Sequence, residues 1–152
     1  MAYIVSKCLF GYDCKYDGTN NENEAVKAFC RGHEVVLICP EQFGGLPTPR
    51  DPSEIRKEGE VRKVYSSRGE DVTKQFETGA LLALRAADLS GCELCILKES
   101  SPSCGVHYVY DGTFSGRKIP SEGLTAKMLR EAGYKVISEK DVEDIELEHN
   151  KG

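Results

Sequence analysis

Cysteine is the residue type in this sequence with the clearest chemical potential. The chain holds seven cysteines, an odd number that does not suit a closed disulfide framework. Three of them lie in segments rich in turn-forming and polar residues: Cys8 in SKCLFGYDCKYDG, Cys39 in CPEQFGGLPTPRDP and Cys104 in KESSPSCG. Thiolates are the ligands that select zinc and iron–sulfur clusters. The three cysteines are therefore candidate ligands of one metal centre, and spacing alone does not identify the metal.

The other four cysteines have different prospects. Cys14 shares a loop with Cys8 and is a candidate fourth ligand, because closed metal sites usually have four. Cys30 lies inside a predicted helix, so we expect it to pack in the core. Cys92 and Cys95 form a C-x-x-C motif, but it follows a helix and enters a strand, the reverse of the order in redox motifs. We interpret both as structural and expect their side chains to point to opposite faces.

The elements that must position these loops alternate between strand and helix. Short apolar runs, typical of strands buried on both faces, occupy residues 2–6, 34–38, 93–97 and 135–138. Helices are predicted over residues 22–31, 73–89 and 121–132, each followed within two residues by a glycine. This order predicts one α/β domain over residues 1–152: a mainly parallel sheet flanked by helices, Rossmann-like and three-layered. Because loops after parallel strands converge at one edge of the sheet, Cys8, Cys39 and Cys104 are expected to meet there.

Two segments lie outside this alternation. Residues 61–72 predict a small hairpin that turns near Arg68 and Gly69, an excursion from the main sheet with a structural role. Residues 140–152 form an acidic tail that we expect to be a partly frayed helix.

Composition limits the function classes. Hydrophobic residues at 39% and charged residues at 30% are typical of a globular protein. A net charge of -5 argues against an extended nucleic-acid surface, which requires clustered cations. The first residues do not resemble a signal sequence, and apolar runs are far shorter than the roughly 18 residues of a membrane span. We therefore expect a cytoplasmic protein without a membrane partner; the oligomeric state has no signature in the sequence.

Four longer motifs cover nearly the whole chain. They are S-x-C-L-x-G followed by Y-D-G at residues 6–18, C-P-E-x-x-G-G-L-x-x-P-R at 39–50, L-K-x-x-S-P-S-C-G at 97–105 and G-x-T-A-x-x-L-R-x-x-G at 123–133. In these motifs the sequence resembles a family catalogued as domain of unknown function 523, whose characterised members are thiouracil desulfidases. The resemblance implies a 4Fe-4S cluster bound by Cys8, Cys39 and Cys104, with one iron lacking a protein ligand. In the family pattern the position of Cys14 is often not cysteine.

The resemblance also implies a reaction. Sulfur would be removed hydrolytically from a thiolated pyrimidine, such as a 2-thiouracil or 4-thiouracil derivative, and released as hydrosulfide without net electron transfer. The expected partner is then a small thiolated base or nucleotide. An iron without a protein ligand is an open Lewis-acid position for the soft sulfur of a C=S group. A fourth protein ligand would block that position.

Polar residues near the three cysteines are candidates for proton transfer and substrate binding. Glu41 is the candidate to activate water, and Ser101 is the candidate to hydrogen-bond that base or relay a proton. The candidate substrate-binding residues are Tyr16, Asp17, Gly44, Gly45, Arg50 and Ser103. Glycines allow the backbone close to a ligand, and Arg50, like Lys98, is a cation that can neutralise cluster charge or meet a phosphate. His107 is interpreted as structural.

Two other classes of function remain open. Cys8, Cys14, Cys39 and Cys104 together could close a structural zinc site, in which case the fold is a binding scaffold. The same four residues could instead hold a cluster in a redox or sensor module. Whether Cys14 is a ligand separates these classes from a catalyst.

Overall fold

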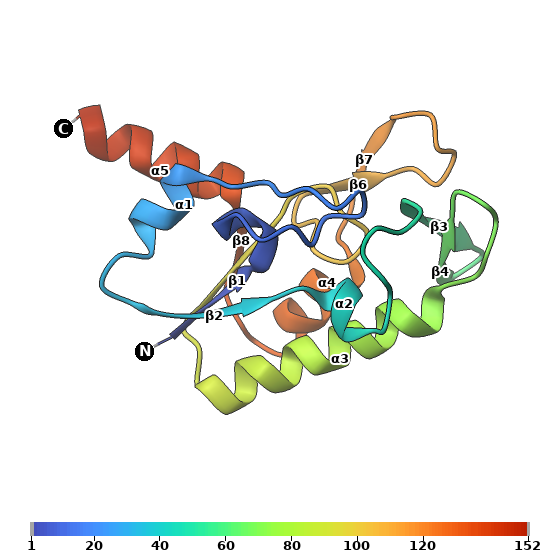
Figure 1. The fold of residues 1–152 in the computed structure, drawn as a ribbon, viewed down its shortest axis with the longest axis horizontal. Helices are drawn as coiled ribbons and strands as arrows, with labels where there is room; N and C mark the ends of the chain where they lie inside the picture. Colours follow the sequence, from blue (N-terminus) through green and yellow to red (C-terminus); the bar gives the residue numbers. More distant parts are fainter. Residues whose placement is uncertain (1, 152) are drawn as a thin grey trace.

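Four parallel strands form the central sheet of the computed structural model, which describes residues 2–151 (Figure 1). In spatial order they are β2 (Glu34–Ile38), β1 (Ala2–Ser6), β5 (Leu94–Leu97) and β8 (Val136–Ser138). All residues of β1 and β5 are buried, because helices cover both faces of the sheet. The predicted α/β fold with a mainly parallel sheet is confirmed.

Helices form one layer on each face of this sheet. In Figure 1 they are α1 (Glu24–Phe29) and α5 (Glu139–Lys151) above it, and α3 (Thr73–Ser90) and α4 (Leu124–Glu131) below it. Alternate residues of β1 point to opposite layers: Tyr3 and Val5 pack with Val26 and Val142, whereas Ile4 packs with the α3 and α4 side. No helix among residues 2–151 is long and apolar enough to cross a membrane.

The helix predicted over residues 22–31 is shorter in the structure. The side chain of Asn23 accepts a hydrogen bond from the amide of Val26 at 3.0 Å, so Asn23 caps the helix and Glu24 begins it. The helix ends at Cys30, which is buried in the core as expected. The acidic tail forms α5, and its last residue, Gly152, lies outside the described residues.

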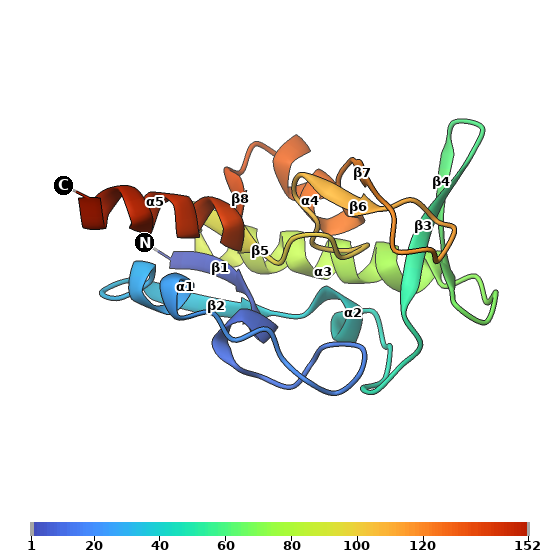
Figure 2. The ribbon, with the colours of Figure 1, turned by 90° about the horizontal axis from the view of Figure 1, so that it is seen from above.

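The hairpin predicted over residues 61–72 is present in part. After the turn near Arg68 and Gly69, Tyr65 and Asp71 form an isolated antiparallel bridge, and the amide of Val72 donates to the carbonyl oxygen of Val64 at 2.9 Å. Ser66 Oγ supports this turn by accepting hydrogen bonds from the amides of Arg68 and Glu70. The prediction missed the longer pairing of β4 (Val61–Ser66) with the preceding strand β3 (Ser53–Glu58). A second hairpin, β6 (Tyr108–Tyr110) with β7 (Lys118–Pro120), was not predicted. Figure 2 shows β3 and β4 projecting from the body of the molecule.

The expectation that Cys92 and Cys95 point to opposite faces is also wrong. Their sulfur atoms lie 3.8 Å apart, and both residues belong to the core cluster between the sheet and α3. Strand alternation does not apply because Cys92 lies in the turn after α3, outside β5. Burial raises the pKa of both thiols, so neither forms a thiolate readily. Both cysteines are core residues.

Candidate active site

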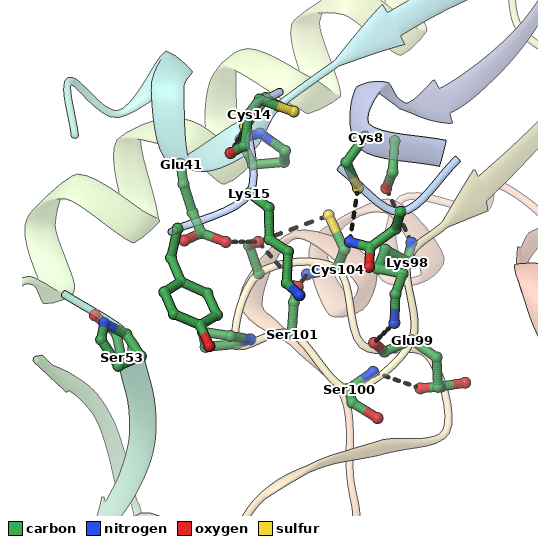
Figure 3. A pocket seen from close by; sticks show the side chains of 18 of the residues that line it. Cys8, Cys14, Lys15, Glu41, Ser53, Lys98, Glu99, Ser100, Ser101 and Cys104 are labelled. Carbon is green, nitrogen blue, oxygen red and sulfur yellow. Dashed lines mark hydrogen bonds between the residues drawn. The ribbon is translucent and has the colours of Figure 1, made fainter. Parts of the chain in front are cut away.

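Cys8, Cys39 and Cys104 come together at the carboxyl edge of the central sheet. Cys8 lies in a short 3-10 helix, η1 (Lys7–Phe10), directly after β1, and Cys39 caps the short helix α2 (Pro40–Phe43) after β2. Cys104 lies in the loop after β5. All three, together with Cys14, line one cavity of about 450 Å³. Figure 3 shows the sulfur atoms of Cys8 and Cys104 turned toward each other across this cavity.

Cys14 affects the thiols beside it. Its side chain lowers the pKa of Cys8 and lowers that of Cys39 to about 7, whereas burial raises the pKa of Cys104 to about 12. The Cys39 thiol also contacts the Cys14 loop directly, because its Sγ lies 3.8 Å from the carbonyl oxygen of Cys14. Cys8 and Cys39 are therefore the thiols that ionise more readily than Cys104.

The donor set fits an iron–sulfur cluster. Among residues 2–151, no three His, Cys, Asp or Glu side chains are grouped so as to hold a metal ion. The cysteines instead line the walls of a common cavity. In a 4Fe-4S cluster each cysteine binds a different iron, so thiols spread around a cavity suit such a cluster, and sulfur is the donor that these clusters take from proteins.

Glu41 lies beside the cysteines with both carboxylate oxygens engaged. Its Oε1 accepts a hydrogen bond from Arg50 Nε at 3.1 Å, and its Oε2 accepts one from Ser103 Oγ at 2.9 Å. Arg50 also donates to the carbonyl oxygen of Cys14 at 2.9 Å and to Thr48 Oγ1 at 3.0 Å. The Arg50 side chain is only 6% exposed. Arg50 therefore fixes the position of Glu41 relative to the Cys14 loop.

The cysteine loop after β5 holds two serine hydroxyls near Glu41. Ser103 Oγ lies 3.2 Å from Ser101 Oγ and 3.6 Å from Cys104 Sγ. Ser101 Oγ accepts a hydrogen bond from the amide of Cys104 at 2.6 Å. Ser103 is thus the direct partner of Glu41, and Ser101 is one hydrogen bond further away. The three side chains form a continuous chain of hydrogen bonds beside Cys104.

A buried carboxylate that the sequence did not reveal holds this loop in shape. Glu99 Oε1 accepts hydrogen bonds from four amides, those of Ser100, Val106, His107 and Tyr108. Burial raises the pKa of Glu99, but the four amides together outweigh burial, and the net shift is downward. Lys98 lines the cavity, and its Nζ contacts Glu139 Oε2 at 3.2 Å and donates to the carbonyl oxygen of Glu99 at 2.9 Å.

Three of the predicted substrate-binding residues do not line the cavity. Asp17 faces solvent and accepts hydrogen bonds from Thr19. Gly44 packs against α3, since a Cβ there would lie 1.9 Å from the carbonyl oxygen of Gln75. Gly45 has a φ of 91°, so glycine is needed there to form the turn after α2 and not to approach a ligand. Tyr16, Arg50 and Ser103 do line the cavity, so these three keep a direct place in the site.

Sequence reasoning missed one wall of the cavity. Glu54 of β3, Tyr110 at the end of β6 and Phe114 in the loop after it line the same cavity as the cysteines. One signal was present in the sequence: the tetrapeptide Y-D-G-T occurs at residues 16–19 and again at 110–113.

Comparison with known proteins gives consistent matches. Residues 3–141 match the family described as 2-thiouracil desulfurase. The uncharacterized protein YbbK of Bacillus subtilis (strain 168) is 43% identical over 148 residues, which cover 93% of this chain and 98% of YbbK. Among solved structures, a 4Fe-4S-dependent thiouracil desulfidase, TudS, superposes with a TM-score of 0.85 at 38% identity and covers 99% of each chain.

Proposed function

The chain belongs to the 2-thiouracil desulfurase family, and from this we propose that it is a 4Fe-4S-dependent thiouracil desulfidase. The net reaction exchanges the sulfur of a C=S group for the oxygen of water, giving a C=O group and hydrogen sulfide, so no electron donor is consumed. One observation carries the proposal: Cys8, Cys39 and Cys104 line one cavity in which Glu41 is hydrogen-bonded to Ser103.

In this proposal Cys8, Cys39 and Cys104 bind the cluster. When bound, a cluster with one iron free of protein ligand supplies a Lewis-acid position that binds thiocarbonyl sulfur and polarises its carbon. Cys14 lines the same cavity without being a ligand in this proposal, and its carbonyl oxygen accepts a hydrogen bond from Arg50 at 2.9 Å.

Glu41 is the base that takes a proton from the attacking water. Its two oxygens are held by Arg50 and Ser103, so the carboxylate keeps one orientation toward the cavity. Ser103 hands a proton to the departing sulfur, and its hydroxyl lies 3.6 Å from Cys104 Sγ, beside the proposed cluster. Ser101 supports this relay through its contact with Ser103. The first proton that leaves water thus reappears on the released hydrosulfide, and the second, lost when the C=O group forms, passes to solvent.

Tyr16 and Arg50 are the proposed substrate-side residues of the cavity. Tyr16 lies on its wall, where a ring can meet a flat base. Because Arg50 donates to Glu41, Cys14 and Thr48, its main proposed contribution is to orient Glu41. The proposed substrate is a small thiolated pyrimidine, as a base or as a nucleotide.

Metal analysis and turnover test this proposal together. Protein reconstituted without oxygen should contain about four iron and four sulfide per chain and should convert 2-thiouracil to uracil and hydrosulfide. Protein that holds one zinc and no iron, or that holds the cluster and leaves a panel of thiolated pyrimidines unchanged, would refute it.

The number of cysteine ligands is tested by Cys14→Ser. Serine keeps a small side chain at this position but removes the thiol, so with three cysteine ligands we expect the variant to retain its iron and its activity. Cys104→Ser is the matched control and should lose the cluster. Loss of iron in Cys14→Ser as well would instead indicate four protein ligands, and hence a redox, sensor or structural site.

A further inference from the structure

Two loops of the chain form the same turn from the same four residues. In residues 16–19 the amide and hydroxyl of Thr19 both donate to Asp17 Oδ1. In residues 110–113 the amide and hydroxyl of Thr113 both donate to Asp111 Oδ1. The glycine of each turn has a positive φ, 80° in the first and 92° in the second. Each turn therefore presents its leading tyrosine in the same local framework.

Both leading tyrosines lie on the wall of the cysteine cavity. Tyr16 belongs to the loop of Cys14, and Tyr110 ends β6. Each has a lysine over its ring, with Lys15 Nζ 5.6 Å from the centroid of Tyr16 and Lys118 Nζ 5.5 Å from that of Tyr110. Two loops distant in sequence thus supply matching aromatic groups to one cavity.

A third aromatic residue of this wall is held in an unusual conformation. Phe114 has a φ of 58°, which L-residues with large side chains rarely adopt. Its amide donates to Glu54 Oε1 at 3.1 Å, and the amide of Gly112 donates to the same oxygen at 3.0 Å. Arg56 Nε donates to the carbonyl oxygen of Gly112 at 3.0 Å. The β3–β4 hairpin therefore fixes the loop that carries Phe114.

Glu54 is unusual because glutamate side chains are rarely buried. It is only 9% exposed, and one of its carboxylate oxygens accepts hydrogen bonds from two amides of a loop at the cavity wall. A strained backbone conformation such as that of Phe114 persists where surrounding contacts enforce it, and such strain is common at ligand-binding sites. The enforced conformation places the half-buried side chain of Phe114 on the wall of the cavity that the cysteines line.

We propose that Tyr16, Tyr110 and Phe114 form the subsite that binds the flat ring of the substrate, and that Glu54 is the positioning residue that holds Phe114 there. This inference rests on the proposed desulfidase function. Aromatic side chains stack on any planar heteroaromatic ring, because each such ring has a π-face. The subsite therefore takes planar six-membered thiolated heterocycles and gives little affinity to acyclic thioamides.

The test uses cluster-loaded protein kept free of oxygen, with Tyr110→Leu and Phe114→Leu as variants that keep an apolar side chain without an aromatic ring. Tyr108→Leu is the matched control, since Tyr108 lies two residues from Tyr110, is 48% exposed and is not among the residues lining the cavity. We expect KM for 2-thiouracil to rise by about 5-fold or more in the first two variants, the range of a lost stacking contact, with kcat and iron content little changed. The control should match wild type.

Uracil binding provides a readout that does not depend on turnover. Calorimetric titration with uracil should show weaker binding in Tyr110→Leu and Phe114→Leu and unchanged binding in Tyr108→Leu. Glu54→Ala should reproduce the rise in KM with kcat retained. Glu54→Gln should restore the wild-type KM, because its amide oxygen accepts the same two hydrogen bonds. A positioning role thus predicts rescue, which a requirement for the Glu54 charge would not allow.

The possible results separate this inference from the proposed function. If the wild-type protein converts 2-thiouracil, and Tyr110→Leu and Phe114→Leu have the same KM and the same affinity for uracil as wild type, the proposed subsite is wrong and the proposed desulfidase function stands. Cluster-loaded wild-type protein that neither binds uracil nor converts any thiolated pyrimidine would overturn both.

Discussion

Replacing Arg50 with methionine should destabilise the protein far more than breaking an exposed ion pair on its surface does. Methionine keeps an unbranched apolar side chain in place of the arginine stem but removes the guanidinium. That group donates to Glu41 at 3.1 Å, to Cys14 at 2.9 Å and to Thr48 at 3.0 Å. The change therefore removes the cation beside Glu41 and the donor to Glu41 Oε1, and leaves Ser103 as the donor to Glu41 Oε2.

The magnitude follows from burial. The side chains of Arg50 and Glu41 are 6% and 15% exposed, so Glu41 would be left as a largely buried, uncompensated charge. Breaking a buried pair on one side costs about 3–5 kcal/mol. The matched control is Arg68→Met, because Arg68 Nε lies 3.2 Å from Asp51 Oδ2 with side chains 76% and 38% exposed. Exposed pairs contribute no more than about 1 kcal/mol, so the two variants isolate the effect of burial.

Urea unfolding of the reduced protein at neutral pH measures this difference. With a slope of about 1–3 kcal/mol per molar urea, the midpoint of Arg50→Met should fall by about 1 M or more, and that of Arg68→Met by much less. Equal midpoints for the two variants would contradict the reasoning, because they would mean that Glu41 is solvated or paired elsewhere once Arg50 is gone.

Three further outcomes follow from individual contacts. Ser103→Ala should lower kcat for thiouracil by about 100-fold at unchanged iron content, and a wild-type rate would exclude Ser103 from proton transfer. The hydrogen bond to Asp141 raises the pKa of His107. Thermal unfolding should therefore show His107→Gln to be less stable than wild type below pH about 6.5, and the difference should be lost as pH rises through the raised pKa. A difference in stability that persists at alkaline pH would argue against this role of His107. Gly79→Ala places a Cβ 2.0 Å from the carbonyl oxygen of Pro40, so calorimetry should show a loss of about 1–3 kcal/mol, and an unchanged melting temperature would mean that the helices separate freely.

The strands and the meeting of the cysteines could be predicted because they depend on local pattern. The apolar, β-branched run at 34–38 coincides with β2, and the strand before Cys8 was likewise found at residues 2–6. Once these strands are parallel, their following loops must share one edge of the sheet. Cys8 and Cys39 follow directly from that rule, since each lies within two residues of a strand end.

The β3–β4 hairpin could not be found in the same way. The sequence of β3, SEIRKE, is mostly polar, and only Glu54 and Ile55 are buried. Such a strand lacks the alternation that identifies half-buried strands, since most of its side chains are charged and it pairs only with β4. The turn at Gly59 was also less evident than the Arg68 and Gly69 pair, whose turn brings Asp71 back to Tyr65 of β4 in a single antiparallel bridge.

The residues that shape the cavity were hidden for a related reason: their contacts join segments that no strand register connects. Glu54 reaches Gly112 and Phe114, and Glu99 reaches the amides after Cys104. A glutamate in a sequence is normally interpreted as a surface residue, and neither its burial nor its partners can be deduced from neighbours. The repeated Y-D-G-T is the exception, because identical residues in two loops imply an identical turn. The meeting of cysteines that follow strand ends is therefore open to prediction from one sequence, whereas a cavity wall built from loop-to-loop hydrogen bonds becomes predictable only where the loops share such a signature.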